Sequence, residues 1–149
     1  MELRTVEEVN TLVVKISTPV KKLPEVMGPA FAEIAGVAGS LGVELTGSPF
    51  AIYHNMDMAN LDVEMGFPVS RKVAGKGRVK AGTLPGGKAA VTLHLGPYER
   101  IHEAYDRLKG FVQQRGLELE ESCYEVYLDD PNETPPDELK TEIYFPVKG

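Results

Sequence analysis

The chain has 149 residues, of which 42% are hydrophobic and 26% charged, and its formal net charge is −6. This is the composition of an ordinary globular domain, and no apolar run approaches the ~18 residues that a membrane-spanning helix requires, so we expect no membrane partner. The negative charge argues against direct DNA binding, because contacts to phosphates need a basic face.

The first half of the chain predicts a strand, a helix and two further strands. After a strand-like segment around Val14, apolar residues recur at helical spacing from Leu23 to Leu41, and Gly42 supplies a left-handed stop. Apolar and polar residues then alternate in the segments 50–53 and 61–69, which is typical of strands. The helix should bury its apolar face on the sheet.

The second half predicts the same series. A strand around Val91 is followed by an amphipathic helix from Ile101 to Val112, which ends before Gly116. Two strands follow, at 124–127 and 139–147. Cys123 precedes the first of them as a small core residue, and a single cysteine excludes an internal disulfide and fits a reducing cytoplasm.

Two sequence blocks recur in both halves. Leu61-Asp-Val-Glu-Met-Gly-Phe-Pro-Val69 and Leu139-Lys-Thr-Glu-Ile-Tyr-Phe-Pro-Val147 share the pattern L-x-x-E-x-x-F-P-V, 78 positions apart. Phe50-Ala-Ile-Tyr53 recurs as Tyr124-Glu-Val-Tyr127. We interpret the chain as one domain, residues 1–149, with pseudo-repeats at about 12–69 and 90–147. A junction between two such halves is a natural place for a ligand cleft.

Strand periodicity sorts the side chains into two faces of the predicted sheet. Under the helices we expect the mainly apolar set Tyr124, Val126, Leu128, Ile143, Phe145 and Val147. The opposite face would carry two carboxylates and two phenols, those of Glu125, Tyr127, Glu142 and Tyr144. The corresponding face of the first half would carry Ala51, Tyr53, Glu64 and Gly66, and its two small residues would leave room for a ligand.

A polar sheet face is often simply solvated. Tyrosines, however, waste apolar area on a wet face, whereas in a cleft they supply flat surfaces and hydroxyl groups. A carboxylate among aromatic rings can hold an organic cation, and a desolvated one can act as a general acid or base. The candidate ligand-binding residues are therefore Glu125, Glu142, Tyr144, Tyr127, Tyr53, Phe50 and Tyr105. Among these, helical spacing favours a core position for Tyr105, and strand spacing puts Phe50 on the helix side.

Other site chemistries are not indicated. The three histidines, His54, His94 and His102, lack metal-ligand spacing, and nucleotide-binding and serine-hydrolase motifs are absent from the sequence. We expect His54 and His94 to be structural or to lie at the rim of a site. No metal and no cofactor is expected.

Several ordered motifs carry a family resemblance. His94-Leu-Gly-Pro-Tyr-Glu99, Ala104-Tyr-Asp-Arg-Leu108, Tyr124-Glu-Val-Tyr-Leu-Asp-Asp-Pro131 and Glu138-Leu-Lys-Thr-Glu-Ile-Tyr-Phe-Pro-Val147 resemble the GyrI-like small-molecule-binding family, the effector-binding domain of multidrug-responsive AraC-type and MerR-type regulators. The resemblance implies an α+β fold, with duplicated strand-helix-strand-strand (SHS2-like) units forming a curved antiparallel sheet with two helices and a central ligand cleft. It places the family's drug-recognising acid at Glu125 and a second acidic-aromatic position at Glu142 and Tyr144.

The resemblance leaves three functions open. Because no helix-turn-helix precedes the domain, we expect a stand-alone cytoplasmic protein that binds aromatic, cationic or amphipathic compounds. The first alternative is a cofactor-free hydrolase of cyclopropane-containing DNA-alkylating toxins, in which Glu125 activates water and Tyr127 orients the substrate. The second is a gyrase-inhibitor-like module that binds a protein partner, either gyrase or a regulator. The sequence does not decide whether the protein is an enzyme.

Overall fold

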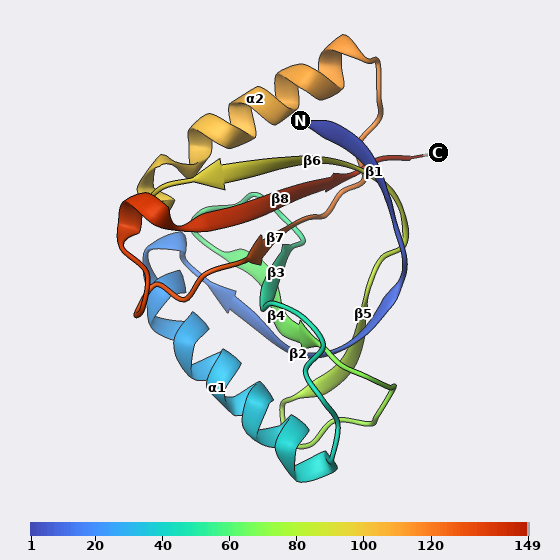
Figure 1. The fold of residues 1–149 in the computed structure, drawn as a ribbon, viewed down its shortest axis with the longest axis vertical. Helices are drawn as coiled ribbons and strands as arrows, with labels where there is room; N and C mark the ends of the chain where they lie inside the picture. Colours follow the sequence, from blue (N-terminus) through green and yellow to red (C-terminus); the bar gives the residue numbers. More distant parts are fainter. Residues whose placement is uncertain (149) are drawn as a thin grey trace. The chain divides into compact units, whose positions relative to one another are not determined.

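The computed structural model describes residues 1–148, and the chain divides into two compact units. Unit 1 comprises Met1–Val6 and Gly87–Gly149, and unit 2 comprises Glu7–Gly86. Each unit contains one α-helix and four antiparallel strands (Figure 1). The fold is therefore α+β, as the sequence predicts.

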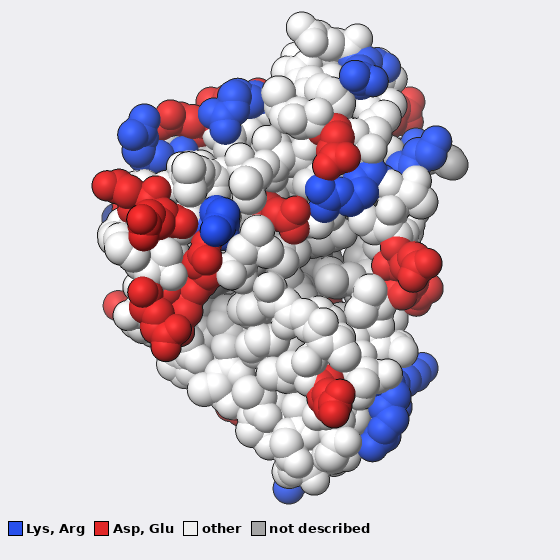
Figure 2. Space-filling model, viewed as in Figure 1, with Lys and Arg blue, Asp and Glu red and all other residues white. Residues whose placement is uncertain are grey.

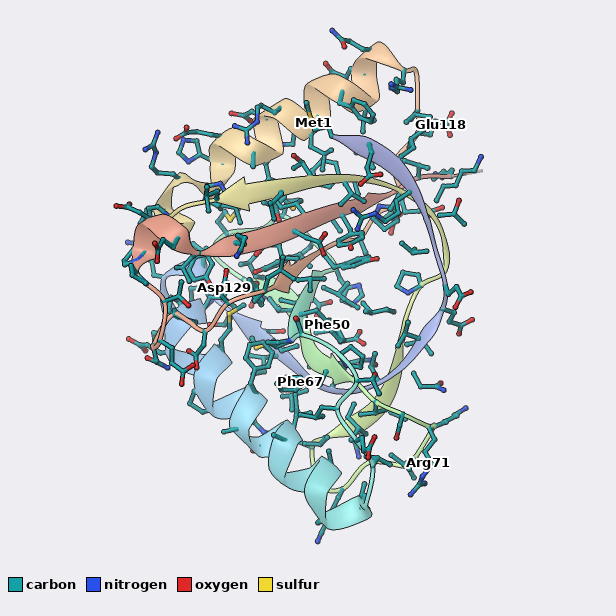
Figure 3. The ribbon with its side chains drawn as sticks, in the orientation of Figure 1. Met1, Phe50, Phe67, Arg71, Glu118 and Asp129 are labelled. Carbon is teal, nitrogen blue, oxygen red and sulfur yellow. The ribbon has the colours of Figure 1, made fainter. Side chains whose placement is uncertain are left out.

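Unit 2 follows the predicted order of strand, helix, strand and strand, and adds a fourth strand that the sequence did not predict. It contains, in chain order, β2 (Val9–Thr18), the short 3-10 helix η1 (Val20–Lys22), α1 (Leu23–Leu41), β3 (Phe50–Tyr53), β4 (Leu61–Pro68) and β5 (Lys80–Leu84). Its strands are ordered β3-β4-β2-β5. Helix α1 ends where its apolar stripe ends, because Gly42 adopts a left-handed conformation with φ of 69°. Phe31 of α1 packs edge-on against Phe67 of β4, which identifies the sheet face that the helix covers. Phe67 is labelled in Figure 3.

Unit 1 repeats this arrangement. It contains β1 (Glu2–Val6), β6 (Gly87–Leu95), η2 (Tyr98–Arg100), α2 (Ile101–Gln114), β7 (Cys123–Tyr127), η3 (Pro136–Glu138) and β8 (Lys140–Pro146), with the strands ordered β1-β6-β8-β7. The apolar face of α2 packs on one face of this sheet. The resulting core consists of Ala90, Ala104, Leu108, Val112, Ile143 and Phe145.

The strand pairing of the two units matches position by position. The central strands have the same order, β6-β8-β7 in unit 1 and β2-β4-β3 in unit 2. The edge strands also correspond. Arg4 of β1 pairs with Ala89, and Gly82 of β5 pairs with Thr11. Arg4 and Gly82 are 78 positions apart, and so are Thr11 and Ala89. In the sequence, each edge strand comes directly before the segment that forms the other unit: β1 is followed by β2 of unit 2, and β5 is followed by β6 of unit 1. Figure 1 shows β1 beside β6 of its own unit. This shared topology is what a duplication predicts, and it extends the similarity to β1 and β5.

The predicted division of residues between the sheet faces is wrong. Residues that are paired across an antiparallel ladder lie on the same face. Glu125 pairs with Ile143, a core residue under α2, and Val126 pairs with Glu142. Glu125 and Tyr127 therefore lie on the helix-covered face, whereas Tyr124, Val126, Glu142 and Tyr144 lie on the opposite face. Ile143 and Phe145 lie under the helix as expected, but Leu128 follows the strand and is exposed.

The same error affects unit 2. Phe67 of β4 faces α1, so its neighbour Gly66 lies on the opposite face of the sheet. Phe50 pairs with Gly66 and therefore also lies on the face away from α1, not on the helix side as predicted. The space at Gly66 is filled: an added Cβ atom would lie 2.5 Å from the Leu12 carbonyl oxygen and 2.9 Å from Phe50 Cζ. Gly66 therefore leaves no room for a ligand. Ala51 and Tyr53 lie on the opposite, helix-covered face.

Charge is distributed unevenly over each unit. The segment 118–142 in unit 1 is strongly acidic, and acidic side chains gather over the β7–β8 connection on the face shown in Figure 2. In unit 2 the segment that begins at Arg71, labelled in Figure 3, is basic. Among residues 1–148, no helix combines the length and apolar character needed to cross a membrane.

Candidate functional site

The candidate site is centred on the carboxylate of Glu125, which is only 7% exposed. Glu125 lies in the middle of β7 on the face that α2 covers. The Tyr127 hydroxyl, from the same strand, donates to Oε1 at 2.9 Å, and the Tyr105 hydroxyl, from α2, donates to Oε2. Each carboxylate oxygen thus accepts a hydrogen bond from a tyrosine. We call Glu125, Tyr105 and Tyr127 the Glu125 centre.

Helix α2 brings Tyr105 to this carboxylate. The Tyr105 ring packs against Phe145 of the core at a centroid distance of 5.6 Å, as its place in the apolar stripe predicts. Its hydroxyl nevertheless extends past the core to β7. The predicted core position is therefore correct for the Tyr105 ring, but it does not describe the hydroxyl, which reaches Glu125. An amphipathic side chain of this kind can pack and bond at the same time.

Tyr98 adds a ring that the sequence interpretation did not include. It lies in η2 and packs edge-on against Tyr127, with the ring centroids 6.0 Å apart. Burial raises the pKa of the Tyr98 hydroxyl, and the negative charge of Glu125 raises it further. The charge of the carboxylate is therefore felt at this ring. The available signal was Gly96-Pro97-Tyr98, a turn that places an aromatic residue directly after β6.

Polar residues continue on the same sheet face beyond Tyr127. His94 Nε2 donates to the Pro97 carbonyl oxygen at 2.9 Å, so this histidine has the structural role expected for it. Thr141 is paired in register with both Tyr127 and His94 and is fully buried. Its hydroxyl oxygen has no hydrogen-bond partner among the described residues. A hydroxyl beside the Glu125 centre thus retains its bonding capacity.

Cys123 begins β7 and packs against the core under α2, as the sequence predicts. Burial raises the pKa of its thiol to about 11, and the charge of Glu125 contributes in the same direction. Because only the thiolate is nucleophilic, we expect iodoacetamide at pH 8 to label the folded protein about 100-fold more slowly than an unperturbed thiol. The rate should rise with pH up to about 11, and urea should abolish the difference. Equal rates in the folded and unfolded protein would contradict this assignment.

Glu142 and Tyr144 form a separate group on the other sheet face. The Tyr144 hydroxyl donates to Glu142 Oε1 at 3.0 Å, and the Tyr144 ring stacks on Tyr124 at 4.6 Å. Arg4 of β1 donates to both Glu142 and Tyr144. The structure therefore divides the predicted single face of four residues into two groups.

The candidate residues of unit 2 do not form one group either. Tyr53 lies on the helix-covered face of β3, whereas Phe50 is fully buried on the opposite face. Glu64, the counterpart of Glu142 in the repeat, is buried and lies with its Oε1 3.0 Å from His54 Nε2. His54 therefore contacts a carboxylate, which the spacing of the histidines did not suggest.

The tyrosine donors should stabilise the Glu125 centre in the folded protein. Tyr127→Phe keeps the ring packed on Tyr98 and removes one hydrogen bond to a buried carboxylate oxygen. We expect a loss of about 1 kcal/mol in the free energy of unfolding, measured by urea denaturation. A Tyr127→Phe protein as stable as the wild type would show that the hydroxyl does not stabilise the carboxylate.

Chemically, the Glu125 centre is a carboxylate with aromatic rings beside it. The two tyrosine hydroxyls orient the carboxylate through their hydrogen bonds. Such a group can bind a cation through charge and through the faces of the rings. It can also accept a proton from a bound water molecule.

Comparisons with known proteins agree with this fold. A family model described as GyrI-like small molecule binding domain matches residues 1–148. The crystal structure of the EcmrR C-terminal domain has a TM-score of 0.87 and 26% identity, covering 99% of this chain and 96% of that chain. The cryo-EM structure of EcmrR in its DNA complex has a TM-score of 0.86 and 26% identity, covering 99% of this chain and 56% of that chain. The chain thus spans just over half of EcmrR.

Two more distant structures show the same fold. A hydrolase encoded by lin2189 from Listeria innocua has a TM-score of 0.72 at 17% identity, over 99% of this chain and 91% of that chain. SAV2435, in a structure with bound tetraphenylphosphonium, has a TM-score of 0.71 at 14% identity, over 99% and 93% respectively. No curated protein matches the sequence significantly.

Proposed function

The chain belongs to the GyrI-like small-molecule-binding domain family, and on this basis we propose that it binds aromatic organic cations at Glu125. It is a small-molecule-binding domain related to the C-terminal domain of EcmrR. The proposal beyond small-molecule binding is that the ligand is an aromatic cation. Cys123 is a free, partly buried cysteine, which is consistent with the cytoplasm, where we place the protein.

The observation that carries the proposal is the buried carboxylate between two phenol donors. A carboxylate is rarely buried without strong partners, because its charge loses the solvation of water. Here two hydroxyls hold it in one orientation. Tyr98 and Tyr127 add ring surface beside it. A flat or multi-ring cation would gain both charge neutralisation and ring contacts in such surroundings.

One structural relative suggests a suitable probe. SAV2435 was solved with tetraphenylphosphonium, a cation surrounded by aromatic rings. Its low identity means that the fold alone is shared, so the ligand is a choice of probe and not evidence for this chain. The chain spans 56% of EcmrR in its DNA complex, and a regulatory role would need the additional segments that EcmrR has.

The test compares a charged ligand with a neutral one of similar outline. Isothermal titration calorimetry with tetraphenylphosphonium and with neutral triphenylphosphine oxide should show tighter binding of the cation. Raising the salt concentration should weaken the binding of the cation only modestly, because buried charges are poorly screened. Equal affinity for the two compounds would contradict the proposal that Glu125 recognises charge.

A hydrolase is the second candidate, and the geometry of Glu125 gives it one supporting observation. A carboxylate held by two hydroxyls is positioned to accept a proton from water, while a tyrosine hydroxyl could orient a substrate. This candidate requires turnover. Incubation with a cyclopropane-containing alkylating toxin, followed by mass spectrometry, should then reveal a product hydrated by one water, and Glu125→Gln should abolish it. Binding without product would favour the first candidate.

A further inference from the structure

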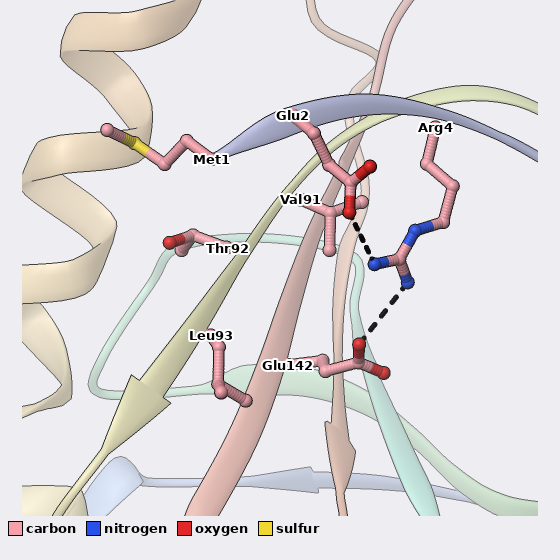
Figure 4. Close-up of a pocket in the computed structure, with 7 residues that line it drawn as sticks. All are labelled: Met1, Glu2, Arg4, Val91, Thr92, Leu93 and Glu142. Atoms are coloured by element: carbon pink, nitrogen blue, oxygen red, sulfur yellow. Dashed lines mark hydrogen bonds and ion pairs between the residues drawn. The ribbon is translucent and has the colours of Figure 1, made fainter.

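The guanidinium group of Arg4 lies beside the carboxylates of Glu2 and Glu142, on the face of the unit 1 sheet away from α2 (Figure 4). Its Nη1 donates to Glu142 Oε2 at 3.2 Å and to the Tyr144 hydroxyl at 2.8 Å. Its Nη2 donates to Glu2 Oε1 at 2.7 Å. The Tyr144 hydroxyl completes the network by donating to Glu142 Oε1. Two carboxylates and a phenol thus surround one planar cation.

Aromatic rings lie beside the same cation. Arg4 Cζ is 5.7 Å from the centroid of the Tyr144 ring, within the range of a cation–π interaction. Tyr144 in turn stacks almost parallel on Tyr124, with an angle of 8° between the planes. Burial raises the pKa of both phenols, so they remain neutral hydrogen-bonding groups at physiological pH. The site therefore combines charge, ring faces and directed hydrogen bonds.

Space for a larger group adjoins the guanidinium. A pocket of about 340 Å³ is lined by Met1, Glu2, Arg4, Val91, Thr92, Leu93 and Glu142. Its volume is near the lower end of the ~300–1,000 Å³ typical of small-molecule sites. Leu93 in its wall is 48% exposed, an unusual exposure for a leucine in the interior of a strand. The pocket could therefore accommodate a small apolar body next to the cation.

The equivalent positions of unit 2 show that the fold does not need this arrangement. The counterparts of Arg4 and Tyr144, 78 positions away, are Gly82 and Gly66, although the carboxylate is kept as Glu64. At Gly82 an added Cβ atom would lie 3.1 Å from Glu64 Oε2, so the backbone closes over the carboxylate. The guanidinium, the phenol and the pocket are thus features of unit 1, added to a carboxylate that both units share.

We propose that this pocket is a recognition site for small planar cations, amidinium or guanidinium groups on an apolar body, and that Arg4 is its built-in competitor. The planar fork of an amidinium can pair with one carboxylate through two hydrogen bonds, whereas Arg4 gives one hydrogen bond to each of Glu2 and Glu142. A ligand would take the place of the Arg4 side chain, which would then turn toward solvent. Because Arg4 is tethered, it competes at an effective concentration on the order of millimolar, which weakens binding to the wild-type protein.

Benzamidine is the probe, and the test removes both the competitor and the other acidic site. Benzamidine is itself an aromatic cation, so all proteins carry Glu125→Gln. Calorimetry should show that Arg4→Ala in this background binds benzamidine at least tenfold more tightly than Glu125→Gln alone. Adding Glu142→Gln should reverse the gain by at least tenfold, because the carboxylate that holds the amidinium is lost.

The controls separate recognition from a structural clip. If Arg4 only clips β1 to the sheet, Arg4→Ala will lower stability and benzamidine will bind no better, which would overturn the proposal. Equal binding with and without Glu142→Gln would overturn it as well. Should Arg4→Ala not fold, Arg4→Gln keeps a polar side chain with an amide donor, although it is shorter and carries no charge, and the same tenfold comparison applies. Neutral benzamide should not show the gain.

Discussion

Replacing Glu125 with glutamine should weaken the binding of tetraphenylphosphonium by roughly 1.5–3 kcal/mol, the range for interactions with a buried charged group. Glutamine keeps the shape of the side chain and can still accept from a tyrosine hydroxyl, but it carries no charge. The affinity for triphenylphosphine oxide should change much less, because a neutral ligand does not use the charge. Calorimetry of both ligands on both proteins gives the difference directly.

A matched control for this substitution is Glu121→Gln. Glu121 is exposed and lies just before β7, so the control makes the same chemical and net-charge change outside the Glu125 centre. Its affinity for the cation should stay within about 0.5 kcal/mol of the wild type. If both variants lose the same affinity, net charge and not Glu125 attracts the cation. If neither loses affinity, the cation binds elsewhere.

Replacing Gly66 with alanine should lower the free energy of unfolding by about 3 kcal/mol, the upper part of the usual range for overpacking. The added Cβ atom would lie 2.5 Å from the Leu12 carbonyl oxygen, 2.7 Å from Val13 Cγ1 and 2.9 Å from Phe50 Cζ. A backbone oxygen in a paired strand cannot move without disturbing the β2–β4 ladder. Urea denaturation followed by circular dichroism measures the loss.

The same change at Gly36 should have the opposite sign. Gly36 lies in α1, and nothing is within 4 Å of its Cβ position. Alanine there should stabilise the protein by about 0.5–1 kcal/mol, because glycine is a poor helix former. A Gly66→Ala protein that is as stable as the wild type would mean that the sheet has room at this position, as the sequence interpretation had assumed.

The helices and strands could be predicted because burial repeats along the chain. The apolar stripes of both helices end close to Gly42 and Gly116, and both glycines adopt positive φ. The repeated L-x-x-E-x-x-F-P-V pattern correctly indicated two units with the same order of elements. These features depend on neighbours a few positions apart, which a sequence displays directly.

The grouping of the site residues could not be obtained in this way. Alternation tells which residues of one strand share a face, but it leaves open how neighbouring strands are aligned. A shift by one residue exchanges the two faces, and this alignment is set by turns and by packing across the whole sheet. The pairing of Glu125 with Ile143 therefore separated Glu125 from Glu142. It also placed the hydroxyl of Tyr105, a residue of helix α2, on the carboxylate.

By itself, the sequence determined the α+β class, the helix ends, the strands other than β1 and β5, and the family resemblance, and it led to the prediction that Glu125 is a site carboxylate. Only the tertiary structure decided which tyrosines contact Glu125 and that Glu142 lies on the other sheet face with Arg4 and Tyr144. The contact between Arg4 and Glu142 joins residues 138 positions apart. It exists because β1 pairs with β6 of unit 1 while the next strand, β2, belongs to unit 2. Local periodicity carries no information about such a long-range pairing, which depends on the packing of the folded sheet.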